Sequence, residues 1–230
     1  MVGYDGNDVI RIKEKSSTND LLAQTFFVMF LGLLATAISS IYTFSSGLYI
    51  ELITDNTYQI LLIAEIVVAL VFSLFFRKAS AGLVTLLFFG YAFLNGVTFS
   101  VIFAVFDITS IIYAFIATAG IYAALAYIGK TTKADLSKFG TILSVTLLAG
   151  IILTLVNLFI GNTGIDIFLN WVILFIFMGF TVYDMNKLTH LSEMGYANND
   201  KLHIYGAMEL YLDFINIFLR LLSIFGRNRD

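Results

Sequence analysis

Charged residues inside long apolar segments are the first candidates for chemistry in this sequence. Five of them stand out: Glu65, Asp184, Glu209, Asp213 and Arg220. An ionisable group inside a membrane is costly, so each of these residues marks a candidate functional site. Such a group binds an ion, carries a proton or pairs with another charge.

The last apolar segment carries most of these groups on one side. Glu209, Asp213, Asn216, Arg220 and Ser223 follow one another at spacings of four, three, four and three residues. That spacing puts them on one face of a helix. We interpret the segment as a central helix with its polar face inside a bundle, where Glu209, Asn216 and Arg220 are candidates for an ion path. The alternative is an amphipathic helix lying on the membrane surface.

Asp184 and Asp213 are predicted to lie at similar depth. Asp184 is near the end of the sixth apolar segment and Asp213 is in the first half of the last, and these segments run in opposite directions. Two carboxylates in a poorly hydrated site do not both ionise without a large cost, so they tend to share a proton. The pair is therefore a candidate proton sensor. On position alone, Asp184 is as consistent with a helix-end charge that reaches the interface.

The second apolar segment adds two charges. Arg77, at its end, is predicted at the depth of Asp184 and is a candidate for closing a gate, with a membrane anchor beside Lys78 as the alternative. Glu65, near the middle, is a candidate for the ion path, and a protonated structural residue is the alternative.

The composition requires a membrane around most of these residues. Of 230 residues, 59% are hydrophobic and 13% are charged, whereas a soluble domain carries roughly 25% charge. A span needs about 20 apolar residues. We predict an all-α bundle with seven transmembrane helices, over residues 21–44, 57–76, 81–105, 108–129, 139–160, 167–188 and 204–225.

The spans define the remaining organisation. Residues 1–20 are predicted to form a cytoplasmic tail, 21–226 a single polytopic membrane domain and 227–230 a short polar C-terminus. Alanine and glycine are frequent in 108–129, which predicts close helix packing and no chemistry there. The absence of cysteine excludes thiol catalysis and disulfides.

The basic residues predict the orientation. If the first six helices span, one side receives Arg11, Lys13, Lys15, Arg77, Lys78, Lys130, Lys133, Lys138, Lys187 and Lys201. The opposite loops contain Glu51, Asp55, Asp107 and Asp166 and no lysine or arginine. The positive-inside rule then predicts a cytoplasmic N-terminus. If the last segment spans the membrane, Arg227 lies outside. The alternative is six spans plus a re-entrant segment, in which case Arg227 lies in the cytoplasm.

Three motifs resemble the Bax inhibitor-1 family of membrane proteins. They are residues 90–98 (GYAFLNGVT), 181–184 (TVYD) and 209–216 (ELYLDFIN), and they occur in family order. The resemblance implies a seven-helix bundle with the last helix central, in the inner membrane of a bacterium. It also implies a pH-sensitive calcium leak.

In that family the sensor is a pair of aspartates, which maps here to Asp184 and Asp213, and both are candidate transient calcium ligands. In that family an arginine bridges to this pair in a closed state. The resemblance implies that Arg77 is the corresponding residue here.

Two other functional classes are alternatives. One is a regulatory membrane protein that acts through partners, such as a protease or cell-death proteins. The other, an intramembrane aspartyl protease, is disfavoured because the sequence before Asp213 is not Gly-x-Gly and the chain has no proline for a Pro-Ala-Leu motif. We expect no enzymatic activity and no cofactor. The expected partners are the lipid bilayer, calcium ions and membrane proteins, but no nucleic acid.

Overall fold

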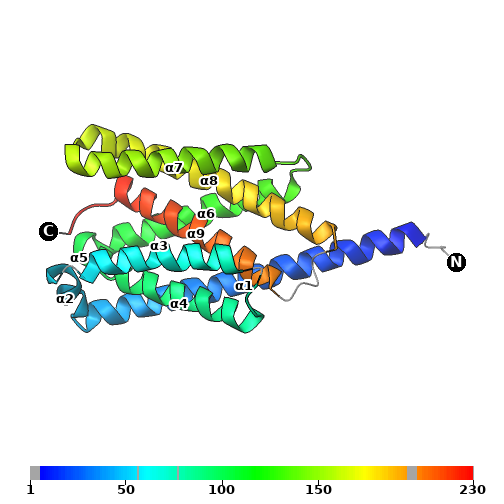
Figure 1. The fold of residues 1–230 in the computed structure, drawn as a ribbon, viewed down its shortest axis with the longest axis horizontal. Coiled ribbons are helices and arrows are strands. Elements are labelled where there is room, and N and C mark those ends of the chain that lie inside the picture. Colours follow the sequence, from blue (N-terminus) through cyan, green and yellow to red (C-terminus); the bar gives the residue numbers. More distant parts are fainter. Residues whose placement is uncertain (1–5, 56, 77, 196–200, 230) are drawn as a thin grey trace. The chain divides into compact units, whose positions relative to one another are not determined.

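The regular elements in the described part of the chain are all α-helices (Figure 1). The computed structural model describes residues 6–55, 57–76, 78–195 and 201–229. The helices are α1 (Gly6–Ser45), α2 (Leu48–Thr54), α3 (Thr57–Phe75), α4 (Ala81–Phe99), α5 (Ile102–Val105), α6 (Ile108–Thr131), α7 (Ser137–Ile160), α8 (Thr163–Glu193) and α9 (Leu202–Phe225). A helix satisfies the backbone polar groups of its interior within one segment, which a bilayer demands.

Among the residues that the structure describes, five helical segments are long and apolar enough to cross a membrane. They are Thr18–Ser45, Ala81–Val105, Ile108–Thr131, Ser137–Asn157 and Thr163–Glu193. A sixth candidate combines α2 with α3, which are bent by 94°. The prediction of a multi-pass helical membrane protein is thus confirmed, with five or six of the seven predicted spans. The seventh, α9, is one continuous helix of 24 residues that contains three charged side chains.

Several boundaries differ from those predicted. Helix α1 begins at Gly6, so most of the predicted tail is helical. The predicted span 81–105 is divided at Ser100 and Val101 into α4 and α5. Local capping explains two boundaries that agree with the prediction. At the start of α6, the Asp107 side chain accepts a hydrogen bond from the Ser110 amide at 3.2 Å, and at the end of α7, Gly161 has a φ of 69°.

The helices group into two compact units. Unit 1 comprises Met1–Phe106, Ser192–Tyr211 and Arg229–Asp230, and unit 2 comprises Asp107–Leu191 and Leu212–Asn228. The first part of α9 belongs to unit 1 and the rest to unit 2.

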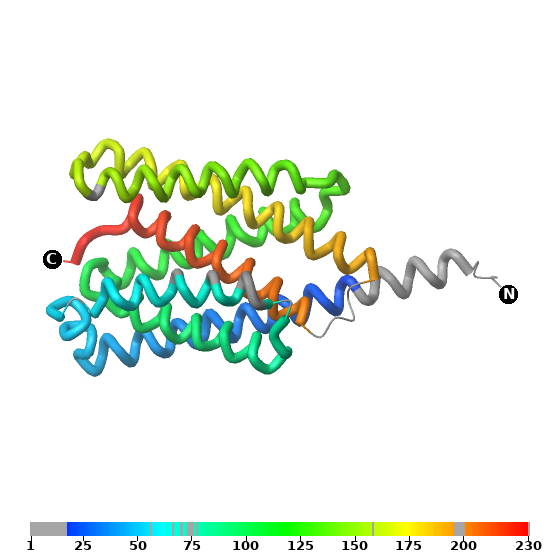
Figure 2. Tube along the Cα trace, viewed as in Figure 1, coloured from blue at the N-terminus to red at the C-terminus, as the bar shows by residue number. Residues whose placement is uncertain are grey.

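In unit 1, α1 and α4 lie side by side (Figure 2). Two hydroxyls of α1 bond to carbonyls of α4: Thr36 Oγ1 to Ala92 O at 2.9 Å and Ser39 Oγ to Phe93 O at 3.1 Å. Gly96 permits this approach, because a Cβ there would overlap the carbonyl oxygen of Thr36 and the hydroxyl of Ser39. Small and hydroxyl-bearing residues at a helix contact are typical of membrane packing.

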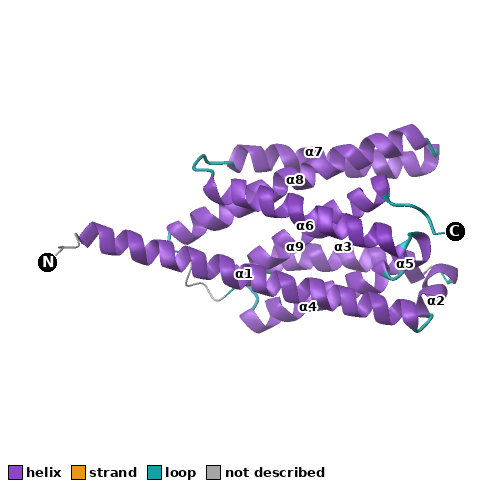
Figure 3. Cartoon of the chain, turned by 180° about the vertical axis from the view of Figure 1, so that it is seen from behind, coloured by secondary structure: helices purple, strands orange, loops and turns teal. Residues whose placement is uncertain are grey.

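In unit 2, α6, α7 and α8 pack together (Figure 3). Gly129 of α6 lies against the backbone of Val182, and Gly140 of α7 lies against the ring of Tyr183. Val182 and Tyr183 are consecutive residues of α8, so this helix is held on two sides immediately before Asp184.

Candidate functional site

Asp184 and Asp213 are both buried within unit 2. Asp184, on α8, is 6% exposed, and Asp213, on α9, is 3% exposed. Both carboxylates interact electrostatically with Tyr122 of α6, whose side chain is 5% exposed. Three helices of one unit therefore bring two acids and a phenol into one buried neighbourhood. Helix α8 continues to Glu193, so Asp184 is not at its end.

Packing around Tyr122 fixes this neighbourhood. The ring of Tyr122 meets Phe214 edge-on, with centroids 5.5 Å apart, and Phe115 contacts the same phenylalanine at 5.4 Å. Because Phe214 follows Asp213 in α9, these rings anchor the helix where it carries the acid. Thr181, one turn before Asp184, is fully buried and donates to Phe177 O at 3.0 Å.

Tyr122 is one residue of this site that the sequence did not indicate. The surrounding alanines and glycine predicted packing alone. One signal was present: α6 has three tyrosines, and Tyr113 and Tyr127 are exposed whereas Tyr122 is buried. Helical periodicity places Tyr113 and Tyr127 on one face of α6 and Tyr122 on the opposite face, but it does not identify the buried face.

Two candidates for the ion path on the polar face of α9, Asn216 and Arg220, lie in unit 2. Arg220 donates from Nη1 to Asn170 Oδ1 of α8 at 2.7 Å. Asn216 donates from Nδ2 to Leu212 O at 2.8 Å, a bond within its own helix. Asn170 was not predicted as part of the site. The guanidinium of Arg220 is thus tied to α8, the helix that carries Asp184.

Glu65 and Glu209 belong to unit 1. Thr98 Oγ1 donates to Glu65 Oε1 at 2.6 Å, and this carboxylate also interacts electrostatically with Tyr91 and Tyr211. Glu209 accepts a hydrogen bond from the Tyr205 hydroxyl. The predicted acids thus divide into two sets, and the aspartate pair is the set in unit 2.

Arg77 lies outside the described residues. The residues near it are held by Lys201, whose Nζ donates to Phe76 O at 3.3 Å and to Ala79 O at 2.9 Å. As for a resident metal, no group of three or more His, Cys, Asp or Glu suited to hold one occurs among the residues that the structure describes.

Comparison with known proteins gives one family over almost the whole chain. The family described as "Inhibitor of apoptosis-promoting Bax1" matches residues 18–230. Inner membrane protein YbhL of Escherichia coli (strain K12) is 37% identical over 224 residues, which are 95% of this chain and 96% of that protein. A protein of Deinococcus radiodurans is 33% identical, with 95% of this chain and 94% of that protein covered. A protein of Borreliella burgdorferi is 32% identical, with 92% and 94% covered.

These matches confirm the resemblance drawn from the three motifs. An inner membrane relative and several apolar helices also support the predicted location in a bacterial inner membrane. The chain is a multi-pass membrane protein that belongs to the Bax inhibitor-1 family.

Proposed function

We propose that this protein is a pH-sensitive calcium leak channel in which Asp184 and Asp213 form the sensor. The observation that carries the proposal is the burial of both carboxylates within one unit, where each interacts electrostatically with Tyr122. Calcium is the transported ion, and no cofactor or enzymatic step is part of the proposal. Carboxylate oxygens are hard ligands that suit Ca²⁺.

The gate follows from the cost of two buried charges. One shared proton holds two carboxylates together, whereas two bare carboxylates repel. Loss of the proton therefore favours a state in which the carboxylates of α8 and α9 separate or bind a cation. Tyr122 of α6 interacts electrostatically with both acids.

We propose that the bundle has seven spans, with α9 as the seventh and the N-terminus in the cytoplasm. Support comes from the end of α9, which meets the loop before α6: Asp107 N donates to Arg227 O at 3.0 Å, and Arg227 N donates to Ser110 Oγ at 3.1 Å. The charge asymmetry of the loops puts Asp107 outside. A re-entrant segment would return Arg227 to the opposite side.

Calcium flux into liposomes that contain only this protein tests the proposal across a range of pH. Asp213→Asn keeps size and hydrogen-bonding capacity but removes the ionisation, so its flux should no longer follow pH. Asp184→Asn should behave the same way. The double variant should add little, because the pair titrates as one unit.

Glu209→Gln is the matched control, since it neutralises an acid of the same helix that lies in unit 1. It should change conductance more than the pH profile. Wild-type pH profiles in both aspartate variants would overturn the proposal, as would the absence of calcium flux in the wild type at every pH.

Arg77 has a proposed role in the closed state. By the resemblance, its guanidinium bridges to the aspartates when the gate is shut. Arg77→Ala should then raise the leak at the pH where the wild type is quiet. An unchanged leak would leave Arg77 as an anchor at the membrane surface.

A further inference from the structure

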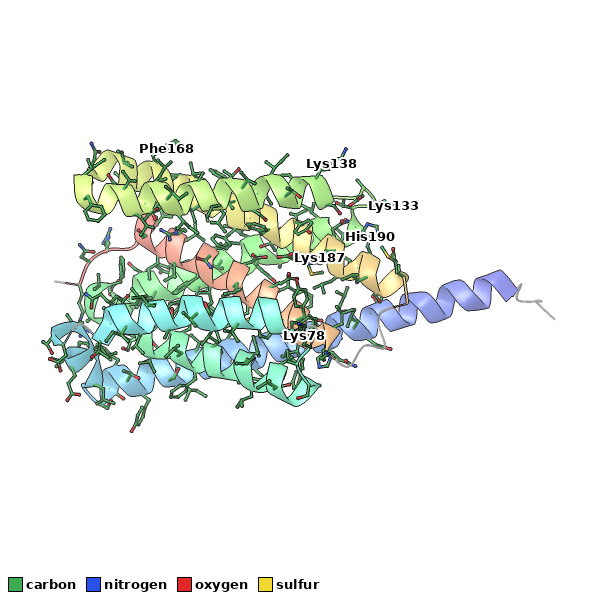
Figure 4. All side chains as sticks on the ribbon, in the orientation of Figure 1. Lys78, Lys133, Lys138, Phe168, Lys187 and His190 are labelled. Carbon is green, nitrogen blue, oxygen red and sulfur yellow. The ribbon has the colours of Figure 1, made fainter. Side chains whose placement is uncertain are left out.

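Four lysines gather at one end of unit 2. Residues 130–138 and 185–191 contain one acid, Asp135, and four lysines, which are Lys130, Lys133, Lys138 and Lys187. Figure 4 shows Lys133, Lys138, Lys187 and His190 at this end, while Phe168, early in α8, lies toward the other end. The four lysines come from the end of α6, the α6–α7 loop, the start of α7 and the last part of α8.

The backbone beneath these lysines is held by specific contacts. Asn186, 3% exposed, donates from Nδ2 to Thr132 O of the α6–α7 loop at 2.7 Å. Gly140 lets α7 rest on the ring of Tyr183. The loop and the start of α7 are therefore both fixed to α8, and the lysines they carry are presented on a defined frame.

The lysine side chains are positioned differently. Lys187 Nζ lies 5.8 Å from the centroid of the Tyr183 ring, a cation–π arrangement that restricts it. Lys133 and Lys138 are exposed. Lys138 and His190 both interact electrostatically with Asp135, which also accepts two hydrogen bonds from Ser137. Asp135 therefore offsets part of the positive charge at this end.

Apolar side chains continue from the lysines along the helices. On α6 these are Tyr127 and Ile128, and on α7 they are Phe139 and Ile142, all exposed. A surface that is cationic at the helix ends and apolar one turn further matches the two parts of a phospholipid, its charged headgroup and its acyl chains. A soluble acidic peptide would use the lysines but not the apolar side chains.

We infer that this end of unit 2 binds the headgroup of an anionic phospholipid, with Lys133, Lys138 and Lys187 on the phosphate. The acyl chains lie against the exposed side chains of α6 and α7. This site is separate from the proposed calcium leak and does not depend on it. It also does not depend on which leaflet this end contacts.

Native mass spectrometry of the detergent-purified protein tests the inference by counting bound lipid. The protein is titrated with phosphatidylglycerol and, separately, with phosphatidylcholine. The wild type should retain phosphatidylglycerol in preference, and Lys133→Ala/Lys138→Ala should weaken that binding about tenfold. Raised salt should weaken it as well. Lys133→Arg/Lys138→Arg keeps the charge and should retain the preference.

Lys78→Ala is the matched control, because Lys78 is an exposed lysine of unit 1. It should leave phosphatidylglycerol binding unchanged. Equal binding of the two lipids would overturn the inference, as would equal loss in Lys78→Ala and the double alanine variant. Displacement of the lipid by millimolar inorganic phosphate or by polyglutamate would also overturn it, in favour of a site for soluble anions. A double alanine variant that elutes as an aggregate is replaced by Lys133→Gln alone, for which an undiminished preference would count against the site.

Discussion

At the scale of single residues, the proposed sensor depends on which polar groups interact with each acid. The sequence contains four acids in its apolar segments, and it predicts Asp184 and Asp213 as a pair and Glu65 and Glu209 as candidates for an ion path. The structure separates them by environment. Glu65 bonds to Thr98 and Glu209 to Tyr205, whereas Asp184 and Asp213 both interact with Tyr122. A proton that two acids share is influenced by every dipole beside them, which makes Tyr122 a positioning residue of the proposed sensor.

Replacement of that phenol gives the first prediction. Tyr122→Phe removes the hydroxyl but keeps the ring that packs on Phe214. The change alters the relative free energy of the protonated and charged pair, so the pH midpoint of calcium flux should move by roughly half a unit or more while maximal flux persists. Liposome flux at closely spaced pH values measures it. Tyr113→Phe, at an exposed position of the same helix, should keep the wild-type midpoint. Coincident midpoints in all three proteins would remove Tyr122 from the sensor.

Outside the membrane, Asp135 offers a second residue-scale prediction. Hydrogen bonds from the Ser137 hydroxyl and amide, at 2.6 Å and 2.9 Å, lower the pKa of Asp135 below its usual value. Because the folded pKa is lower than the unfolded one, this contact stabilises the fold above the unfolded pKa and is lost as pH falls through the lowered value.

Ser137→Ala removes the hydroxyl and should raise the pKa of Asp135 toward the ordinary value. Carboxyl ¹³C NMR of aspartate-labelled protein follows the titration, with Asp135→Asn to assign the signal. Ser144→Ala is the control, because that hydroxyl donates within its own helix to Gly140 O. The same titration curve in Ser137→Ala and the wild type would contradict the proposed cause of the shift.

At the scale of helices, the positions of the spans were predictable because a helix needs a minimum apolar length to cross a membrane. The residues at which each helix begins and ends were less predictable. A charge-free block of about 20 residues marks where a helix must be. It says nothing of how far that helix continues in water, and α1 continues back to Gly6. Packing between helices depends on which small residue faces a neighbour. The sequence has many glycines, and only the structure distinguishes Gly96, which lies against α1, from Gly90, which has open space.

This contrast between two glycines of α4 gives the third prediction. Gly96→Ala places a methyl group where it overlaps the carbonyl oxygen of Thr36 and the hydroxyl of Ser39. The free energy of unfolding should therefore fall by about 1–3 kcal/mol. Thermal unfolding in detergent, followed by size-exclusion chromatography after heating, measures the loss. Gly90→Ala meets no atom within 4 Å and should be neutral or slightly stabilising. Equal melting of the two variants would contradict the close approach of α1 and α4.

At the scale of the whole molecule, the sequence predicted the family, the helical class and the candidate acids. Motifs such as ELYLDFIN are long enough to identify a family, and charge-free blocks identify spans. The division of α9 between two units was not predictable, because a continuous helical pattern looks the same whichever neighbours it meets. Tyr122 and Asn170 were missed for a related reason, since partners on distant helices leave no local pattern.

The orientation of the chain gives the last prediction, and the absence of cysteine makes it directly measurable. Single cysteines replace Asp55 in the loop after α2, Ala134 in the α6–α7 loop and Asn228 after α9; all three positions are exposed. A membrane-impermeant maleimide added to intact spheroplasts should label Asp55→Cys and Asn228→Cys, and it should label Ala134→Cys only after lysis. This pattern follows from a cytoplasmic N-terminus and an α9 that spans, because the backbone at Arg227 bonds to Asp107 in a loop predicted to lie outside. Labelling of Asn228→Cys only after lysis, with Asp55→Cys labelled from outside, would instead require a re-entrant last segment. Labelling of Ala134→Cys alone from outside would reverse the whole bundle.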